Sequence, residues 1–433
     1  MRRSPFHIAL AACLPLLTTG CASTTSFPGW DQPDYLERAT SHSHADLEVT
    51  VATLSAAESE KVYGVPLARR KIQPVWIEVE NRGSATYWLA YPGMDPNFYP
   101  PSEAAEAMVI DDPARALATL APRFEALAFR NPILPGEKVS GFVLTQLHEA
   151  VKFVQIDLIA DGESQSFSFF TVVPGLRVDY QSTATARDRL LTEQPVTDYT
   201  DDEAFQEALR SLPCCATNKR GTKNGDPLNL VVIGSVADAF PALIRRGWTP
   251  TEVTWFGSVM RMVQSALAGD RYPYAPISNL YLYGRPQDIA LQKARDNIHQ
   301  RNHLRLWRSA MTYHGKPVWV GQISRDIGSR LTIHSPTFTT HKIDPDVDEA
   351  STALVEDMAY SQNLRAVGYV SGVGAAPRSD PRRNLTTDPY YTDGRRTVLV
   401  FDEHPTPLAE IAILPWEGGP DGFVRQAIEG NAP

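Results

Sequence analysis

Short runs of alternating apolar and polar residues follow one another through the segment 45–176. They lie at residues 47–54, 75–80, 138–144, 153–159 and 166–173. A period of two is typical of strands that bury one face of a sheet, and turn-forming pairs such as Pro135-Gly136 separate the runs. One helix is predicted among them, near residues 112–127. We therefore expect residues 45–176 to form an immunoglobulin-like β-sandwich.

The rest of the chain mixes helical and strand patterns. Residues 228–233 form a continuous apolar run, which predicts a buried strand, and Ser235 can cap the helix that follows. Residues 303–308 and 318–323 predict a hairpin that turns at His314-Gly315.

The remaining elements complete an α+β pattern, not a regular βαβ repeat. They are predicted helices at residues 258–267, 287–298 and 345–360, and predicted strands at residues 279–283, 366–370 and 397–401. Residues 177–376 are therefore expected to form one α+β domain. Residues 377–433 are expected to form an exposed loop and a closing strand, so the protein is predicted to be multidomain.

The N-terminus has the features of an exported lipoprotein. Two arginines precede an apolar stretch, residues 8–17, that is too short to span a bilayer as a permanent helix. The sequence Leu-Thr-Thr-Gly before Cys21 resembles a lipobox, the signal for lipid attachment to the cysteine. We expect a signal peptide at residues 1–20, lipid on Cys21 and a flexible tether at residues 21–44. The alternative is an ordinary secretory signal that contains a cysteine.

This reading places the protein in the bacterial cell envelope, facing the periplasm. Ala22 stands where an aspartate commonly retains lipoproteins in the inner membrane, so the outer membrane is favoured. The net charge of −9 disfavours nucleic acid as a partner. The expected partners are the membrane, reached through the N-terminal lipid, and an envelope protein.

Cysteine usage argues against a disulfide scaffold. After Cys13 and Cys21, the sequence contains only the adjacent pair Cys214 and Cys215. Packing must therefore hold the folded cores together. Adjacent cysteines meet disulfide geometry badly, so we expect reduced thiols, with a strained vicinal disulfide as the alternative.

Several short motifs stand out between residues 212 and 373. They lie at residues 225–234, 247–248, 275–278, 283–289, 303–307, 318–321, 325–328 and 341–348. Together they resemble the LssY C-terminal domain family. The resemblance implies a domain of bacterial envelope proteins, but it implies no particular reaction, because the family has no established biochemical activity.

Polar residues that could carry chemistry gather between residues 285 and 348. They are Arg285, Asp288, His303, Arg305, Asp326, His341 and Asp344. Histidine with carboxylates can hold a divalent metal, and arginine can stabilise an anionic oxygen. The sequence contains no Gly-x-Ser-x-Gly elbow, no His-Glu-x-x-His and no Walker loop, so the standard hydrolase and NTPase classes lose support.

Some of these residues also have a purely structural explanation. Asp344 before Pro345 is typical of a helix N-cap with proline at the first helical position, and Arg305 could belong to a buried Arg-Asp pair. Two functions remain open. The first, favoured by the missing signatures, is a non-catalytic module that binds a ligand or an envelope partner. The second is a membrane-tethered, metal-assisted hydrolase of phosphate or other esters.

Overall fold

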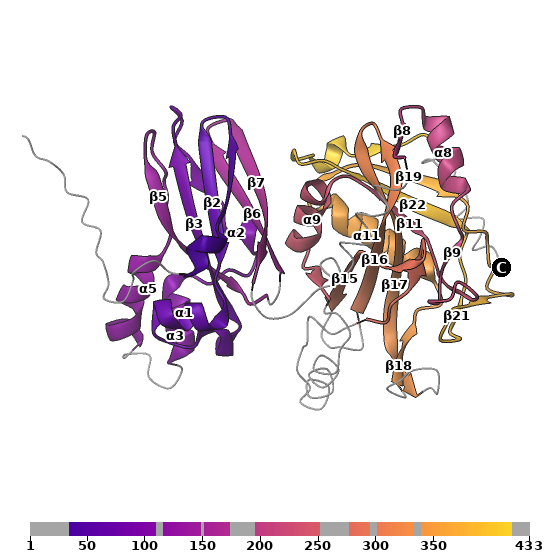
Figure 1. Ribbon diagram of the computed structural model, residues 1–433, viewed down its shortest axis with the longest axis horizontal. Coiled ribbons are helices and arrows are strands. Elements are labelled where there is room, and N and C mark those ends of the chain that lie inside the picture. Colours follow the sequence, from indigo (N-terminus) through magenta and orange to yellow (C-terminus); the bar gives the residue numbers. More distant parts are fainter. Residues whose placement is uncertain are drawn as a thin grey trace, which may run out of the picture.

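The computed structural model describes residues 34–109, 116–148, 151–173, 195–251, 277–294, 301–331 and 339–417. Figure 1 shows two folded bodies, an N-terminal one and a C-terminal one. The predicted signal peptide, Cys21 and the predicted helix at residues 258–267 lie outside the described residues. Within the described ranges, no helix is both long enough and apolar enough to cross a membrane.

The N-terminal body is built on two antiparallel sheets that share one core. Their strand orders are β1-β2-β3-β5 and β4-β6-β7. The strands are β1 (Thr40–His44), β2 (Leu47–Thr53), β3 (Ile72–Asn81), β4 (Trp88–Leu89), β5 (Lys138–Gln146), β6 (Val151–Ala160) and β7 (Glu163–Val172). Val49 and Ile77 of the first sheet pack with Ile156 and Phe167 of the second. All five strands expected from the alternating runs are confirmed, as β2, β3, β5, β6 and β7.

Among the described residues, this body contains several short helices where the pattern predicted one. They are α1 (Ala56–Tyr63), α2 (Tyr91–Met94), α3 (Pro101–Met108) and α5 (Ala121–Leu127), the last within the predicted helix at residues 112–127. Helices α1, α3 and α5 gather at one end of the sheets (Figure 1) and share a second apolar core with Ile72, Phe142 and Leu144. The single-helix prediction is wrong because helices this short contain too few turns to show a clear 3.6-residue period.

The predicted tether at residues 21–44 is wrong in its last part. Asp34–Arg38 is a 3-10 helix in which Tyr35 is buried, and β1 pairs with β2. The ring of His42 stacks on Phe169, with centroids 4.5 Å apart. Every residue of β1 is exposed, so this edge strand has no apolar alternation by which the sequence could reveal it.

A mixed sheet of ten strands forms the centre of the C-terminal body. Its order is β12-β15-β16-β17-β11-β22-β19-β23, with β18 paired to β17 and β8 paired to β16. The strands are β8 (Thr197–Tyr199), β11 (Leu230–Ile233), β12 (Thr249–Pro250), β15 (Ile289–Ala294), β16 (Arg301–Tyr313), β17 (Lys316–Leu331), β18 (Thr339–Ile343), β19 (Leu364–Ser371), β22 (Arg395–Phe401) and β23 (Ala412–Ile413). The predicted hairpin is confirmed as β16 and β17, which turn at His314 and Gly315, both at positive φ.

The two faces of this sheet have different neighbours. Helices α9 (Val236–Arg245) and α11 (Val347–Ala359) pack on one face. Helix α8 (Asp202–Arg210) packs on the opposite face, beside a small sheet of order β10-β9-β13-β14. The strands of the small sheet are β9 (Cys215–Thr217), β10 (Asn224–Pro227), β13 (Tyr281–Leu282) and β14 (Arg285–Pro286). The predicted cap of α9 is confirmed, because Ser235 forms a capping box with Asp238.

The predicted helix at residues 287–298 is wrong, because Ile289–Ala294 is strand β15. Four successive residues, from Ile289 to Gln292, are buried. A strand covered on both faces gives a continuous apolar run, and periodicity alone cannot separate such a run from a buried helix.

The predicted closing strand at residues 397–401 is confirmed as β22, but the segment from residue 377 is not separate from the α+β domain. Strand β22 lies inside the large sheet, between β11 and β19. The segment before it contains the paired strands β20 (Arg382–Arg383) and β21 (Pro389–Tyr390), with Asn384 and Asp388 buried. The polar, proline-rich composition predicts an exposed loop, and residues 377–381 are indeed exposed, but Asn384, Asp388 and Tyr390 later in the segment are buried. The α+β domain therefore extends past residue 376.

Helix α9 lies on the side of the C-terminal body that faces the N-terminal body (Figure 1). The ring of Phe240 lies against Phe153 of β6 and Phe170 of β7, with centroids 6.3 and 5.3 Å away. Arg245 forms an ion pair with Asp157 of β6, with 3.1 Å between nitrogen and oxygen. The two-sheet body thus meets the side of the large sheet that carries α9 and α11.

Candidate functional site

A cluster of buried polar side chains lies on the face of the large sheet opposite α9 and α11. Arg301, His303 and Arg305 occupy alternate positions of β16 and are 2%, 5% and 6% exposed. Because side chains alternate along a strand, these three point to the same face. We call the following set the polar cluster: Arg301, His303 and Arg305 of β16, Gln292 of β15, Gln322, Ser324 and Asp326 of β17, and the covering residues Asp226, Asn384 and Asp388.

The strand register places the partners of the three basic residues. Gln292 and Ser324 lie directly opposite His303, on either side of β16, and Gln322 lies opposite Arg305. Directly opposite residues of antiparallel strands share a face and have close Cβ atoms. The hairpin register therefore brings these side chains together.

Arg301 and His303 converge on one carboxyl group. The Oδ2 atom of Asp326 lies 3.4 Å from Nε2 of His303 and 3.8 Å from Nε of Arg301. Arg301 Nη1 also donates to Oε1 of Gln292 at 2.6 Å. This half of the cluster is a buried guanidinium, imidazole and carboxyl in mutual contact.

Arg305 extends the cluster toward the small sheet. Its Nη1 donates to Oε1 of Gln322 at 2.7 Å, and its Nη2 donates to the carbonyl of Ser278 at 3.1 Å. Beside it, Nε2 of Gln322 and Nε1 of Trp307 are buried donors with no hydrogen-bond acceptor among the described residues. Two buried N–H donors beside Arg305 therefore lack an acceptor among the described residues.

Residues from distant parts of the chain cover the cluster. Asp226 comes from β10, and its Oδ1 accepts a hydrogen bond of 2.9 Å from Nδ2 of Asn384. Asn384 in turn accepts from the backbone N–H of Asp388 at 2.9 Å. The segment between β20 and β21 is thus joined to β10 above the strand face.

Burial changes the protonation of the carboxyl groups. It raises the pKa of Asp326 to about 8, against the opposing effect of Arg301 and Arg305. Burial likewise raises the pKa of Asp226, again against Arg305. Although burial lowers the pKa of Arg301, a guanidinium stays charged in a protein. At neutral pH, Asp326 is therefore mainly protonated, and the cluster carries less negative charge than its three carboxyl groups suggest.

The structure brings together three of the predicted site residues, His303, Arg305 and Asp326. Arg285 and Asp288 instead pair with each other, at 2.6 Å between Nη2 and Oδ2. The same groups bind the backbone of Arg308, whose carbonyl accepts from Arg285 and whose N–H donates to Asp288. Arg285 and Asp288 thus hold the β14–β15 turn against β16.

Asp344 does not join the polar cluster. Asp344 lies 3.8 Å from Nη1 of Arg325, and Arg325 leaves β17 on the face opposite to its neighbour Asp326. The predicted N-cap is also wrong, because Asp346 caps α11 by accepting from two backbone N–H groups, while Asp344 accepts from the N–H of Asp346. The backbone of His341 pairs with Ser329, and its side chain lies outside the described residues.

Sequence reasoning missed most of the residues around His303 and Arg305. Arg301, Gln322 and Ser324 continue the alternation of the two hairpin strands, so drawing the register from the turn at His314 would have found them. Gln292 could not be found in this way, because residues 287–298 were predicted to form a helix and not the strand β15. Asp226, Asn384 and Asp388 carry no local signal, because their proximity depends on the tertiary fold.

The metal expected as a possible cofactor has no assembled ligand set in the part of the chain that the structure describes. There, no three histidine, cysteine, aspartate or glutamate side chains are grouped so as to hold a metal ion. The carboxyl groups of the polar cluster lie near the guanidinium groups of Arg301 and Arg305, and these positive charges oppose the binding of a metal ion.

Comparison with known families places the whole polar cluster in one domain. Residues 206–395 match the model of the family described as LssY C-terminus. The chain therefore carries an LssY C-terminal domain, as its motifs predicted, and every residue of the polar cluster falls inside the matched range. No curated protein shows significant similarity to the chain.

Proposed function

We propose that the LssY C-terminal domain of this protein is a ligand-binding module of the bacterial cell envelope, and that the polar cluster binds a small molecule through an anionic oxygen group. The observation that carries this proposal is a pair of buried N–H donors beside Arg305 for which the described residues provide no acceptor. Nε2 of Gln322 and Nε1 of Trp307 lack acceptors among the described residues, and both neighbour Arg305 in the strand register.

The physical chemistry of these groups favours an anion. A guanidinium presents paired N–H donors that match the two oxygens of a carboxylate or phosphate. A buried donor without an acceptor costs about 1–3 kcal/mol, so a ligand oxygen that accepts from it gains affinity. A protonated Asp326 adds a hydroxyl donor and removes a negative charge that would repel the ligand.

Calorimetric titration of the full chain with inorganic phosphate, and separately with acetate, tests the proposal. We expect one site for at least one of the two anions. Arg305→Lys should weaken it by roughly tenfold or more, because a lysine cannot provide the paired donors. Gln322→Leu should weaken it as well, since it removes a donor while approximately keeping the volume.

The matched control is Arg82→Lys, the same substitution at an exposed position of the N-terminal body, which should leave binding unchanged. If neither anion binds, or if Arg305→Lys and Arg82→Lys bind as the wild type does, the proposal fails.

A second candidate, ester hydrolysis, is favoured by one specific contact. The 3.4 Å approach of His303 to Asp326 places an imidazole beside a carboxyl group, and such a pair can transfer protons. Turnover of p-nitrophenyl phosphate, with and without added Mg²⁺ or Zn²⁺, distinguishes the two functions. Product release that His303→Gln abolishes would establish the hydrolase, whereas saturable binding without release would establish the module.

The proposed location rests on the N-terminal sequence, in which charge, apolar length and small residues precede Cys21. Lipid on Cys21 would anchor the protein at the periplasmic side of an envelope membrane, with the outer membrane favoured. The two-sheet body, with its antiparallel strands, would then act as an immunoglobulin-like spacer or as a docking surface for an envelope protein.

Cys21→Ser is expected to release the protein from membranes, because the acyl chains are the proposed anchor. Fractionation of cells that express each form measures this release. A Cys21→Ser protein that still sediments with membranes in high salt would show that the anchor lies elsewhere, and Cys13→Ser serves as the matched control that should stay bound.

A further inference from the structure

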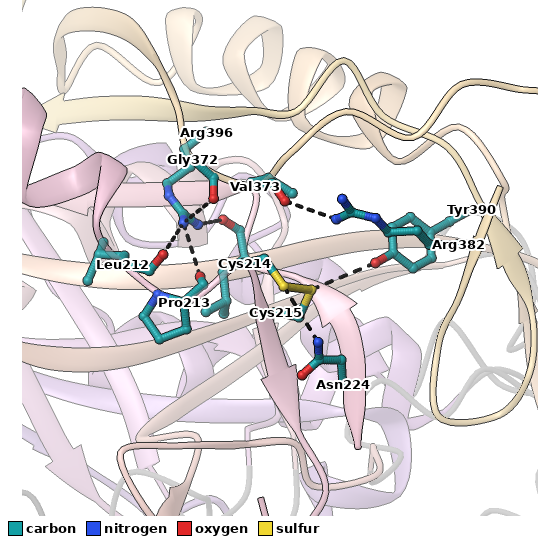
Figure 2. The surroundings of a disulfide bond; sticks show 11 residues. Leu212, Pro213, Cys214, Cys215, Asn224, Gly372, Val373, Arg382, Tyr390 and Arg396 are labelled. Atoms are coloured by element: carbon teal, nitrogen blue, oxygen red, sulfur yellow. Dashed lines mark hydrogen bonds between the residues drawn. A yellow bond between two sulfur atoms is a disulfide. The ribbon is translucent and has the colours of Figure 1, made fainter. Parts of the chain in front are cut away.

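The adjacent cysteines differ from the sequence expectation, because Cys214 and Cys215 are joined by a disulfide (Figure 2). The expectation of reduced thiols rested on the usual Cα separation of disulfides, about 4.4–6.8 Å. Here one peptide bond separates the residues, and their Cα atoms are 3.8 Å apart. Cys215 is 3% exposed, whereas Cys214 is partly exposed, so one sulfur is more accessible than the other.

This disulfide is badly placed to stabilise the fold. Cross-links stabilise mainly by shortening long loops of the unfolded chain, and a link between neighbours closes almost no loop. Other contacts already hold the segment. Nη2 of Arg396 donates to the carbonyls of Leu212 and Pro213 at 2.9 and 3.0 Å (Figure 2), and the N–H of Leu228 donates to the carbonyl of Cys214 at 2.9 Å.

The pair instead touches both elements that cover the polar cluster. Cys215 is paired with Pro227 in β10, next to Asp226. The Sγ of Cys215 also lies 3.8 Å from the hydroxyl of Tyr390, two residues after Asp388. Figure 2 shows Tyr390 on one side of the disulfide and Asn224 on the other, with Nδ2 of Asn224 3.8 Å from Sγ of Cys214.

We propose that Cys214 and Cys215 form a reversible thiol–disulfide site that a dithiol can reduce. The redox state of this site sets how freely β10 and the β20–β21 segment move. The site is separate from the anion binding proposed above and does not depend on it. A disulfide of structural importance is normally buried and closes a loop, whereas labile and regulatory disulfides are exposed. The exposure of Cys214 and the adjacency of the pair fit the second class.

The exchange balances with a dithiol as reductant. A thiolate of the dithiol attacks Sγ of Cys214, the S–S bond breaks, and Sγ of Cys215 leaves as a thiolate that takes up a proton. The second thiol of the reductant then attacks the mixed disulfide and releases Cys214 as a thiol. Two electrons and two protons pass to the pair, and the dithiol becomes a disulfide.

Reduction would free both side chains from the two-residue ring. The Cys215 thiol could then move relative to Tyr390, and the Cys214 thiol relative to Asn224. Because those partners belong to β21 and β10, we expect the backbone amides of these two strands to exchange faster in the reduced protein, while those of the N-terminal body do not change.

Differential alkylation of the full chain tests the redox site. Trypsin cleaves after Arg210 and Lys219, so residues 211–219 form a peptide that contains both cysteines and no other. Folded protein alkylated directly should give this peptide unlabelled and two hydrogen atoms lighter than the dithiol form. Folded protein treated first with dithiothreitol should give it doubly labelled, and an oxidant should restore the unlabelled form.

Hydrogen exchange on the same samples tests the structural consequence. Faster exchange in β10 and β21 on reduction is the expected result, and Cys214→Ser with Cys215→Ser should reproduce it without reductant. The proposal is overturned if the isolated pair is already reduced, if dithiothreitol reaches it only in denaturant, or if reduction changes exchange nowhere. If the serine variant unfolds, alkylation and exchange of the wild type alone decide the matter.

Discussion

Replacing Arg396 with methionine is expected to lower the free energy of unfolding by about 3–5 kcal/mol. Arg396 is fully buried in β22, and its guanidinium donates only to backbone carbonyls among the described residues. These belong to Leu209, Leu212, Pro213, Leu228 and Gly372. Methionine fills similar space but leaves these buried acceptors without their donor, and each such loss costs about 1–3 kcal/mol.

The carbonyls explain why the loss should be large. They come from the end of α8, the loop before the cysteine pair, the residues just before β11 and the residue just after β19, so one side chain joins four parts of the domain. Burial lowers the pKa of Arg396 to about 10, which still leaves it charged at neutral pH. Urea unfolding of the full chain measures the effect, with Arg82→Met as the exposed control. A loss below about 1 kcal/mol would mean that water or a rearranged loop replaces the guanidinium.

Asp326→Asn is expected to stabilise the protein, and by more as the pH rises. Burial raises the pKa of Asp326 to about 8, above the value of about 3.9 for an unfolded aspartate. The folded state therefore binds this proton more tightly than the unfolded state does. The resulting stability is fully present below about pH 4 and is lost as the pH rises toward 8, at about 1.4 kcal/mol per pH unit.

Asparagine resembles the protonated form of aspartate but does not titrate, so the variant does not lose stability as the pH rises. The difference in unfolding free energy between variant and wild type should therefore widen between about pH 4 and 8, reach about 4 kcal/mol near neutrality, and level off above pH 8. Urea unfolding at a series of pH values measures it. Asp161→Asn, in the exposed turn between β6 and β7, should leave the pH profile unchanged. A variant less stable than wild type at every pH would show that Asp326 is ionised and paired with Arg301 or His303.

Local chemistry allowed part of the fold to be predicted. The hairpin of β16 and β17 has clear strand runs and a turn that needs positive φ at His314 and Gly315. Helix α9 has its cap at Ser235 and a buried apolar side. The predictions failed for strands whose sequence shows no alternation of apolar and polar residues. Strand β15 is buried on both faces, and β1 is exposed along its whole length.

Only the residues of the polar cluster that lie on β16 and β17 could be predicted from the sequence. Alternation put His303 and Arg305 on one face, and the hairpin register adds Gln322 and Ser324. The groups that decide its electrostatics come from further away. Asp226 and Asp388 reach it through β10 and the segment before β22, and neither pattern nor composition indicates that those elements meet over β16.

The central claim is that an anionic oxygen group binds at the polar cluster, beside Arg305. Its most direct test is a crystal structure of the protein grown with tungstate, a phosphate analogue whose heavy atom gives a strong anomalous signal. We predict an anomalous peak with oxygens at hydrogen-bonding distance, about 2.7–3.2 Å, from Arg305 and Gln322. Peaks only at surface positions, with none at the polar cluster, would contradict the claim.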